Sequence, residues 1–217
     1  ASALDKNLVT IIVADHGENI GDHKLMDHQL SLHDTLLHVP LIITGHEIGP
    51  EGKTIDRLVN LNALFSTICD LAGAELPNQM SNYPSSLRPL WEQKALETSE
   101  RDYLFAEYAH PEMYLGRLSR YNPEADMRKW ARGQQCVRSE RYKYIVYEDG
   151  VSELFDIQND PEESQNLALR YTDVVAELEH RRLQWRSNFQ IPEDRPRLEA
   201  KDLDDNLRKR LEDLGYV

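Results

Sequence analysis

Seven residues that can bind a metal ion or transfer a proton lie close together near the start of the chain. They are Asp15, His16, Glu18, Asp22, His23, Asp27 and His28. Carboxylates and imidazoles this close repel one another or compete for protons unless a partner organises them. A divalent cation is the usual organiser, since carboxylate oxygens and neutral imidazole nitrogens are both metal ligands. A solvated acidic loop is the alternative.

The pair Asp15 and His16 directly follows the apolar run Leu8–Ala14. In open α/β sheets, ligands bind at the carboxyl ends of strands, and Gly17 permits a sharp turn at this point. The pattern predicts that both side chains face one crevice and hold Ca²⁺, Mg²⁺, Mn²⁺ or Zn²⁺. The alternative is that Asp15 caps a following helix.

Histidines are concentrated in the same part of the chain. Six of the eight are His16, His23, His28, His33, His38 and His46. Their even spacing fits no helical face, so a zinc site built from histidines on one helix is not expected. Several of them could instead surround an anion. A surface or structural role is the expectation for His33, His38 and His46.

The first third of the chain has an α/β pattern. The run Leu8–Ala14 lacks alternation, which is typical of a strand covered on both faces of a parallel sheet. A second strand is expected at Val39–Thr44 and a short helix at Leu30–Leu37. A longer helix is expected at Thr54–Gly73, with an apolar stripe and a glycine at its end.

From about residue 102 the predicted strands become short and alternating, which favours an antiparallel sheet. The expected strands are Tyr103–Tyr108, Gln135–Ser139, Tyr142–Tyr147 and Glu153–Asp156. A hairpin turn at Glu148–Gly150 would join the last two. Two further helices are expected, at Tyr171–Phe189 and Leu203–Leu214.

Composition restricts the class of protein. The 217 residues are 40% hydrophobic, as in folded globular proteins, and no apolar run is long enough to span a membrane. The net charge of −13 argues against a nucleic-acid partner, which needs clustered Lys and Arg. The first residues lack the pattern of a signal peptide. We therefore expect Cys69 and Cys136 to be buried thiols in a reducing, cytoplasmic compartment.

The stretch VADHGENIGDHKLMDHQLSLHDTLLHVPLII resembles the C-terminal metal-site motif of the sulfatase family, within the alkaline phosphatase-like superfamily. The later segments CVRSERYKYI and ELFDIQNDPEESQNLA are similar to family segments in the same order, so the resemblance covers nearly the whole chain. It implies an α/β fold, part of an alkaline phosphatase-like parallel-sheet sandwich followed by a small C-terminal antiparallel sheet with helices. Residues 1–98 would end the catalytic domain, and residues 99–217 would form an α+β subdomain with a helical tail.

The resemblance also implies roles for particular residues. Asp15 and His16 would be two ligands of one divalent cation, with calcium expected first and magnesium or manganese next. The thirteenth residue after Asp15 would contact the sulfate, and most members have lysine there. In this chain the residue is His28, whose charge depends on pH where that of lysine does not. His23 is a candidate neighbour of the metal site, and His110 or Arg117 could border the substrate.

Family members cleave sulfate esters with a formylglycine made from the Cys or Ser of a C/S-x-P-x-R motif. No Cys or Ser of this chain lies in such a motif. The chain therefore looks like the C-terminal portion of a sulfatase. Alone it is expected to be inactive, and its apolar strand edge is expected to pair with the N-terminal half or a second copy. A phosphodiesterase or phosphonate monoester hydrolase of the same superfamily is one alternative, and a non-catalytic scaffold is another.

Overall fold

The computed structural model describes residues 8–45, 48, 52–76, 84–92, 103–109, 115, 130–188, 204, 206, 207, 209 and 210. The chain forms two compact units, Ala1–Leu183 and Gln184–Val217. What is described below belongs to the first unit, apart from the end of α5 and a few residues between 204 and 210. The predicted division between residues 98 and 99 stays a prediction.

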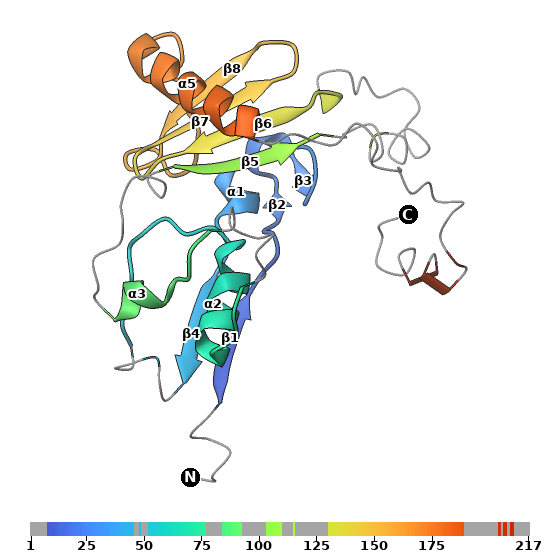
Figure 1. Cartoon of the computed structure of the whole chain (residues 1–217). Coiled ribbons are helices and arrows are strands. Elements are labelled where there is room, and N and C mark those ends of the chain that lie inside the picture. The colour runs from blue at the N-terminus through green and yellow to red at the C-terminus, as the bar shows by residue number, and fades with distance from the viewer. Residues whose placement is uncertain are drawn as a thin grey trace. The chain divides into compact units, whose positions relative to one another are not determined.

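The N-terminal part of this unit contains two small sheets and three short helices (Figure 1). Its elements are β1 (Val9–Val13), β2 (Asn19–Ile20), a 3₁₀ turn (Asp22–Lys24), β3 (Met26–Asp27), α1 (Asp34–Leu37), β4 (Leu41–Gly45), α2 (Ala63–Ala72) and α3 (Arg88–Trp91). β1 pairs with β4, and β2 pairs with β3. The segment that carries the predicted site residues therefore connects β1 to β4.

The sequence predicts that the two apolar strands belong to a parallel sheet, and this is wrong for the pairing seen among the described residues. β1 and β4 are antiparallel, and Val13 at the end of β1 lies opposite Leu41 at the start of β4. A parallel pair needs a crossover that returns the chain to the other end of the sheet. Here the connection contains only the four-residue helix α1 and returns to the end that it left. Asp15 and His16 nevertheless follow the carboxyl end of β1, as predicted.

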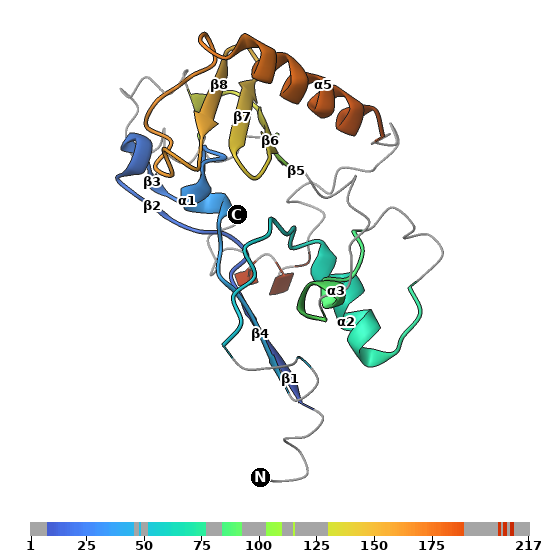
Figure 2. The ribbon, with the colours of Figure 1, turned by 90° about the vertical axis from the view of Figure 1, so that its left-hand side faces the viewer.

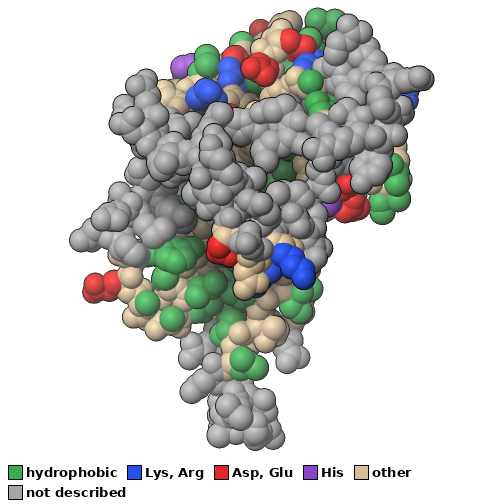
Figure 3. All heavy atoms as spheres, turned by 90° about the vertical axis from the view of Figure 1, so that its right-hand side faces the viewer, with side chains coloured by type: hydrophobic (Ala, Val, Ile, Leu, Met, Phe, Trp, Pro, Cys, Tyr) green, Lys and Arg blue, Asp and Glu red, His purple; other side chains and the backbone are tan. Residues whose placement is uncertain are grey.

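The β1–β4 sheet exposes apolar side chains. Ile12 and Ile42 are 55% and 54% exposed, so the expectation of a strand covered on both faces is also wrong within the described residues. On the nearby helix α2, Phe65 and Ile68 are 41% and 52% exposed. Figure 3 shows hydrophobic side chains in the lower half of the view, at the height of β1, β4 and α2 in Figure 1.

Both helices predicted in this part are shorter than expected, since Leu30–Leu37 is reduced to α1 and Thr54–Gly73 to α2. A local hydrogen bond competes with the predicted start of the second. In the predicted helix Thr54–Gly73, the side chain of Asn60 accepts a hydrogen bond from the amide of Asn62 (2.9 Å), and α2 begins only at Ala63. Its predicted end is confirmed, since Gly73 has the left-handed conformation of a helix C-cap. The apolar stripe is not the buried face, which carries Ala63, Ser66 and Thr67.

The predicted antiparallel sheet is confirmed. Its strands are β5 (Leu104–Tyr108), β6 (Gln134–Arg138), β7 (Tyr142–Tyr147) and β8 (Ser152–Asp156), paired in that order. The turn Glu148–Gly150 joins β7 to β8, and Gly150 takes the positive φ (82°) that such turns require. The helix α5 (Thr172–Asn188) follows, within one residue of its predicted start.

Both faces of this sheet are covered. Successive residues of a strand point to opposite faces. Val137, Tyr144 and Leu154 pack with Leu178 of α5, whereas their neighbours Cys136, Ile145 and Phe155 pack with Leu32. Figures 1 and 2 show α5 along one face and α1 on the opposite side. The second face therefore rests on the segment that precedes α1.

Several expectations concern other segments. Cys136 is buried as predicted, whereas Cys69 is only half-buried. Among the described residues no helix is long and apolar enough to cross a membrane. Of the predicted helix Leu203–Leu214, residues Asn206, Leu207, Lys209 and Arg210 are helical, Asp204 is not, and the others lie outside the described residues. His46, His110 and Arg117 also lie outside them.

Candidate active site

Asp15 and His16 lie side by side directly after β1. The amide of His16 donates a hydrogen bond to Oδ1 of Asp15 (3.0 Å), which fixes the carboxylate against the backbone. The other oxygen, Oδ2, lies 3.8 Å from Nε2 of His16. The Asp15 side chain is 80% exposed, so this residue does not serve as a buried helix cap. The pair faces outward, where it can meet a ligand.

The imidazole of His16 has a defined tautomer. Its Nδ1 lies 2.9 Å from the carbonyl oxygen of Gly17, and a carbonyl can only accept, so Nδ1 carries the proton. Nε2 is then the unprotonated nitrogen, the form in which histidine binds metal ions. Gly17 itself lies against α1, where a Cβ would come within 1.9 Å of the carbonyl oxygen of Thr35. Only glycine allows this approach.

His28 lies beside His16, since His16 precedes the short β2–β3 hairpin and His28 follows it. The two imidazole rings are stacked, with centroids 4.4 Å apart and an interplanar angle of 18°. Nδ1 of His28 lies 2.6 Å from Oδ1 of Asp27 and 3.4 Å from Oε2 of Glu18. Two carboxylates thus hold one edge of this ring. The structure therefore brings together the three residues that the sequence singled out.

The loop around His28 has a strained backbone. Four residues other than glycine have positive φ angles within eight positions: His23 (51°), Lys24 (62°), Asp27 (73°) and Leu30 (69°). Each such residue costs about 1 kcal/mol or more and persists only where the surroundings impose it. Strain of this kind gathers at functional sites, where it holds a side chain in one position. None of these four positions holds a glycine that would have indicated such a conformation.

The donor set of Asp15 and His16 suits a divalent cation. Protein ligand atoms lie about 2.0–2.6 Å from such an ion, so two ligands of one ion are separated by no more than about 5 Å. The 3.8 Å between Oδ2 and Nε2 meets this limit. Two ligands are fewer than the six to eight typical of calcium. The arrangement is therefore a half-site that fits an ion completed by other groups.

A large cavity of about 1560 Å³ adjoins these residues. Asp15, His16 and His28 line it together with Asp34 and Arg138. The rest of its lining is largely apolar and comes from β4, the segment before α2, α3 and β5. Convergent polar groups at one end of an apolar hollow are typical of a binding site.

Sequence reasoning missed several residues that shape this site. Asp27 and Glu18 were part of the charged cluster but had no separate role. Asn19 is fully buried, and its Oδ1 accepts a hydrogen bond from Oγ1 of Thr35 (2.7 Å). Glu163 lies far along the chain, yet its carboxylate accepts a hydrogen bond from the amide of Asp34 (2.6 Å), the first residue of α1. It therefore caps the N-terminus of this helix. No local pattern predicts contacts between such distant segments.

Residues 21–188 match the family model of the N-sulphoglucosamine sulphohydrolase C-terminal region. The chain belongs to this family. Human arylsulfatase K is 30% identical over 82% of the chain and 31% of its own length. The Delta 4,5-hexuronate-2-O-sulfatase of Bacteroides thetaiotaomicron is 31% identical over 82% of the chain and 34% of its own length. The chain thus spans about a third of the length of these relatives.

Solved structures agree with the family assignment. A 2-O GAG sulfatase superposes with a TM-score of 0.67 at 29% identity, over 86% of this chain and 37% of the sulfatase chain. The phosphonate monoester hydrolase of Agrobacterium radiobacter superposes with a TM-score of 0.64 at 25% identity, over 83% of this chain and 35% of the hydrolase chain. The predicted fold class is confirmed, with the correction that β1 and β4 are antiparallel.

Proposed function

We propose that the chain forms the C-terminal part of a sulfatase, an enzyme that hydrolyses a sulfate ester to an alcohol or phenol and sulfate. The observation that carries the proposal is the open pair Asp15 and His16, with ligand atoms 3.8 Å apart and His28 stacked beside them. Family membership and sulfatase relatives support it. Cytoplasmic localisation remains only a prediction.

Asp15 and His16 would hold a divalent cation through Oδ2 and Nε2. Calcium is proposed first because an exposed carboxylate suits a hard ion, and magnesium or manganese are the alternatives. When bound, the ion acts as a Lewis acid that neutralises the sulfate oxygens. The Gly17 carbonyl keeps the proton of His16 on Nδ1, so Nε2 stays available at the site.

His28 would face the sulfate group. Asp27 and Glu18 hold Nδ1, which leaves Nε2 as the nitrogen that can reach the substrate. In the proposed step a nucleophile attacks sulfur, the bond from sulfur to the ester oxygen breaks, and the leaving oxygen takes a proton. In its imidazolium form, which has a proton on both ring nitrogens, His28 would donate that proton, or a hydrogen bond to the sulfate, from Nε2. The nucleophile, a formylglycine hydrate, would come from protein outside this sequence.

The runner-up is a phosphodiesterase or phosphonate monoester hydrolase. The likeness to the Agrobacterium radiobacter enzyme favours keeping it, since that structure is similar at 25% identity. The same half-site would neutralise phosphoryl oxygens. Paired assays on an aryl sulfate and the matching aryl phosphonate or phosphodiester separate the two, because kcat/KM for the natural class should be much larger.

The experiment uses the full-length protein and the 217-residue chain in parallel, each with Ca²⁺, Mg²⁺ or Mn²⁺. An aryl sulfate and a 2-O-sulfated uronate, chosen from the relatives' names, are the substrates. We expect turnover by the full-length protein only. No turnover by the full-length protein on any of the esters, with the metal bound, would contradict the enzyme proposal and favour a scaffold. Turnover by the chain alone would contradict the half-site.

A further inference from the structure

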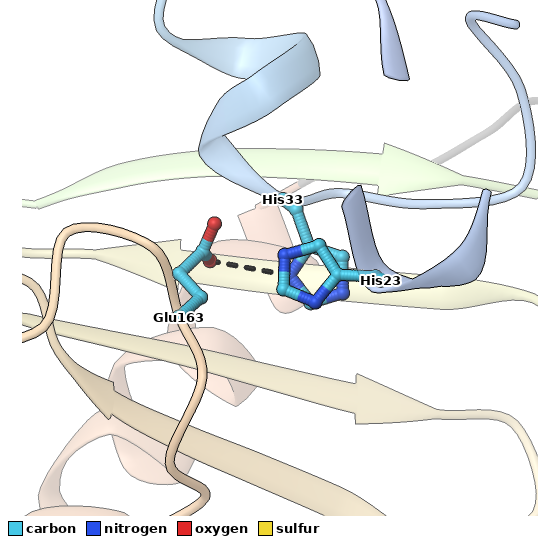
Figure 4. A group of neighbouring side chains, drawn as sticks. All are labelled: His23, His33 and Glu163. Atoms are coloured by element: carbon cyan, nitrogen blue, oxygen red, sulfur yellow. Dashed lines mark ion pairs between the residues drawn. The ribbon is translucent and has the colours of Figure 1, made fainter. Parts of the chain in front are cut away.

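A second cluster of ligand-type side chains lies away from Asp15 and His16. It consists of His23, His33 and Glu163, whose nitrogen and oxygen atoms lie within 4.8 Å of one another. Figure 4 shows the carboxylate of Glu163 pointing at two superposed imidazole rings. Nδ1 of His33 lies 3.3 Å from Oε1 of Glu163, and the two rings stack with centroids 3.5 Å apart. His33 and Glu163 are buried, at 7% and 3% exposed.

The charges around Glu163 are already balanced by the protein. Nζ of Lys143, which is completely buried, lies 2.9 Å from Oε1 of Glu163 and 2.7 Å from Oδ1 of Asp34. Burial alone would raise the pKa of Glu163, but His33 and Lys143 outweigh it and lower this pKa to about 2. The carboxylate is therefore ionised and paired.

A metal ion suits this cluster poorly. The ammonium of Lys143 already contacts the oxygen that an ion would need, and like charges repel in a buried place. The two imidazole rings are also nearly parallel, at 9°. Their lone pairs lie in the ring planes and cannot converge on one ion without a rotation. The cluster works instead as a contact between segments.

The contact joins residues 14–33, called the site loop, to the turn after β8 that carries Glu163 and, through Lys143, to β7. Glu163 meets His33 and the amide of Asp34 at the end of the loop, and through His33 it supports His23 in the middle. In the sequence, His28 lies between His23 and His33. Glu163 itself has a positive φ of 52°, so strain is imposed on both sides of the contact.

We infer that Glu163 is a positioning residue for the loop that carries His28 and adjoins Asp15 and His16. The inference rests on the proposed function of that loop. Glu163 does not touch the substrate; it holds His23, His33 and Asp34 so that the strained loop keeps one conformation. Replacing the carboxylate by an amide puts an NH₂ group where either Lys143 or the Asp34 amide needs an acceptor. The loop should then open.

The test compares Glu163→Gln with two controls in the full-length, metal-loaded protein. Glu162→Gln makes the same chemical change at an exposed neighbour. Leu178→Ala removes a buried contact between α5 and the sheet, so it lowers stability without touching the loop. Each variant is measured for kcat, for Tm, and for amide hydrogen exchange of residues 23–34 against those of β7.

We expect Glu163→Gln to lower kcat about tenfold or more and to speed exchange of residues 23–34 about tenfold, with β7 unchanged. Glu162→Gln should match the wild type, and Leu178→Ala should lower Tm without lowering kcat when assayed below its transition. Wild-type exchange and kcat in Glu163→Gln would overturn the inference. An equal loss of kcat in Leu178→Ala would overturn it too, because the effect would then be stability alone.

Two further measures keep the test decisive. If Glu163→Gln does not fold, the double variant Lys143→Met with Glu163→Gln replaces this ion pair and leaves Asp34 paired with Arg138 (3.5 Å), so it should fold. This pair should still have low kcat and fast exchange, and wild-type values would overturn the inference. If the wild type cleaves no sulfate ester, the proposed function fails, and exchange of residues 23–34 still decides whether Glu163 holds the loop.

Discussion

The four-stranded sheet β5–β8 and the two-stranded sheet β1–β4 differ in how their apolar residues are used. Ile145 of β7 is fully buried between Leu32, Cys136 and Phe155, whereas Ile12 of β1 is 55% exposed. β1 (VTIIV) is the more apolar of the two in sequence, since β7 (YKYIVY) contains Lys143. A run such as VTIIV is stable in water only when it is covered. From this difference we expect the first region to complete its core, and its site, with groups other than the described residues.

The largest expected effect concerns the chemistry of the first region. Asp15→Ala in the full-length protein should lower kcat/KM by about 10³-fold or more, because loss of the cation forfeits several kcal/mol of transition-state stabilisation. Steady-state assays and a titration of bound metal measure the result. Asp149→Ala in the β7–β8 turn is the control, since it removes an exposed carboxylate far from the site loop in sequence. Equal effects of the two variants would contradict the assignment.

The next prediction tests the two cores directly. In the 217-residue chain, Leu154→Ala should lower the free energy of unfolding by about 2–5 kcal/mol, since this side chain is fully buried. Ile42→Ala should cost less than about 1 kcal/mol, since its side chain is 54% exposed. Urea denaturation followed by circular dichroism measures both. In the full-length protein the cost of Ile42→Ala should rise toward that of Leu154→Ala, and a constant small cost would show that this face stays uncovered.

The contact between the regions should be sensitive to acid. The pKa of Glu163 is about 2, below its usual value of 4.5, so its contribution to stability is complete above about pH 4.5 and is lost as the pH falls toward 2. A shift of this size corresponds to about 3 kcal/mol. Urea denaturation between pH 5 and pH 2.5 should show a flatter decline for Glu163→Gln than for the wild type.

The control for the acid prediction is Glu162→Gln, which should follow the wild type. Identical slopes for the wild type and Glu163→Gln below pH 4.5 would contradict the pairing of Glu163 with Lys143.

A second group acts at higher pH. Burial, with help from the charge of His33, lowers the pKa of His23. Its neutral form is therefore favoured in the folded state, and stability should already begin to decline as the pH falls below about 6.5.

The smallest expected effect is self-association of the 217-residue chain. Within the described residues β1 pairs only with β4, so each strand has an edge that can pair with another chain. Light scattering should show a concentration-dependent mass above that of the monomer. Ile12→Lys with Ile42→Lys should weaken the association about tenfold, whereas Leu183→Lys on α5, 51% exposed, should not. A wild-type chain that stays monomeric would contradict the prediction that the edges of β1 and β4 pair with another chain.

The sequence predicted best what depends on neighbouring residues. Alternation of side chains located β5–β8, and the turn at Gly150 follows from residue types in order. The pair Asp15 and His16 was found because it follows a strand. His28 needed the family resemblance, since a histidine on a loop has no local signature. Its place beside His16 is now visible, whereas its role stays a prediction.

The features that the sequence did not predict depend on distant contacts. The start of α1 at Asp34 depends on the carboxylate of Glu163, which lies 129 positions later. The positive φ angles of Lys24 and Leu30 arise because the loop is held by the sheet, not because of their own preferences. The antiparallel pairing of β1 with β4 depends on a connection that contains no crossover helix.

The register of β1 and β4 also makes the segment between them exchangeable. Because Val13 lies opposite Leu41, residues 14–40 leave and rejoin the sheet at neighbouring points. A cassette with closely spaced ends can be transplanted between homologous scaffolds without shifting either strand, since the host only has to supply the same short gap. Such a graft would carry Asp15, His16 and His28 as one block. It would function only in a host that also has a buried carboxylate where Glu163 lies. The residues that the graft needs are therefore not all contained in the segment 14–40.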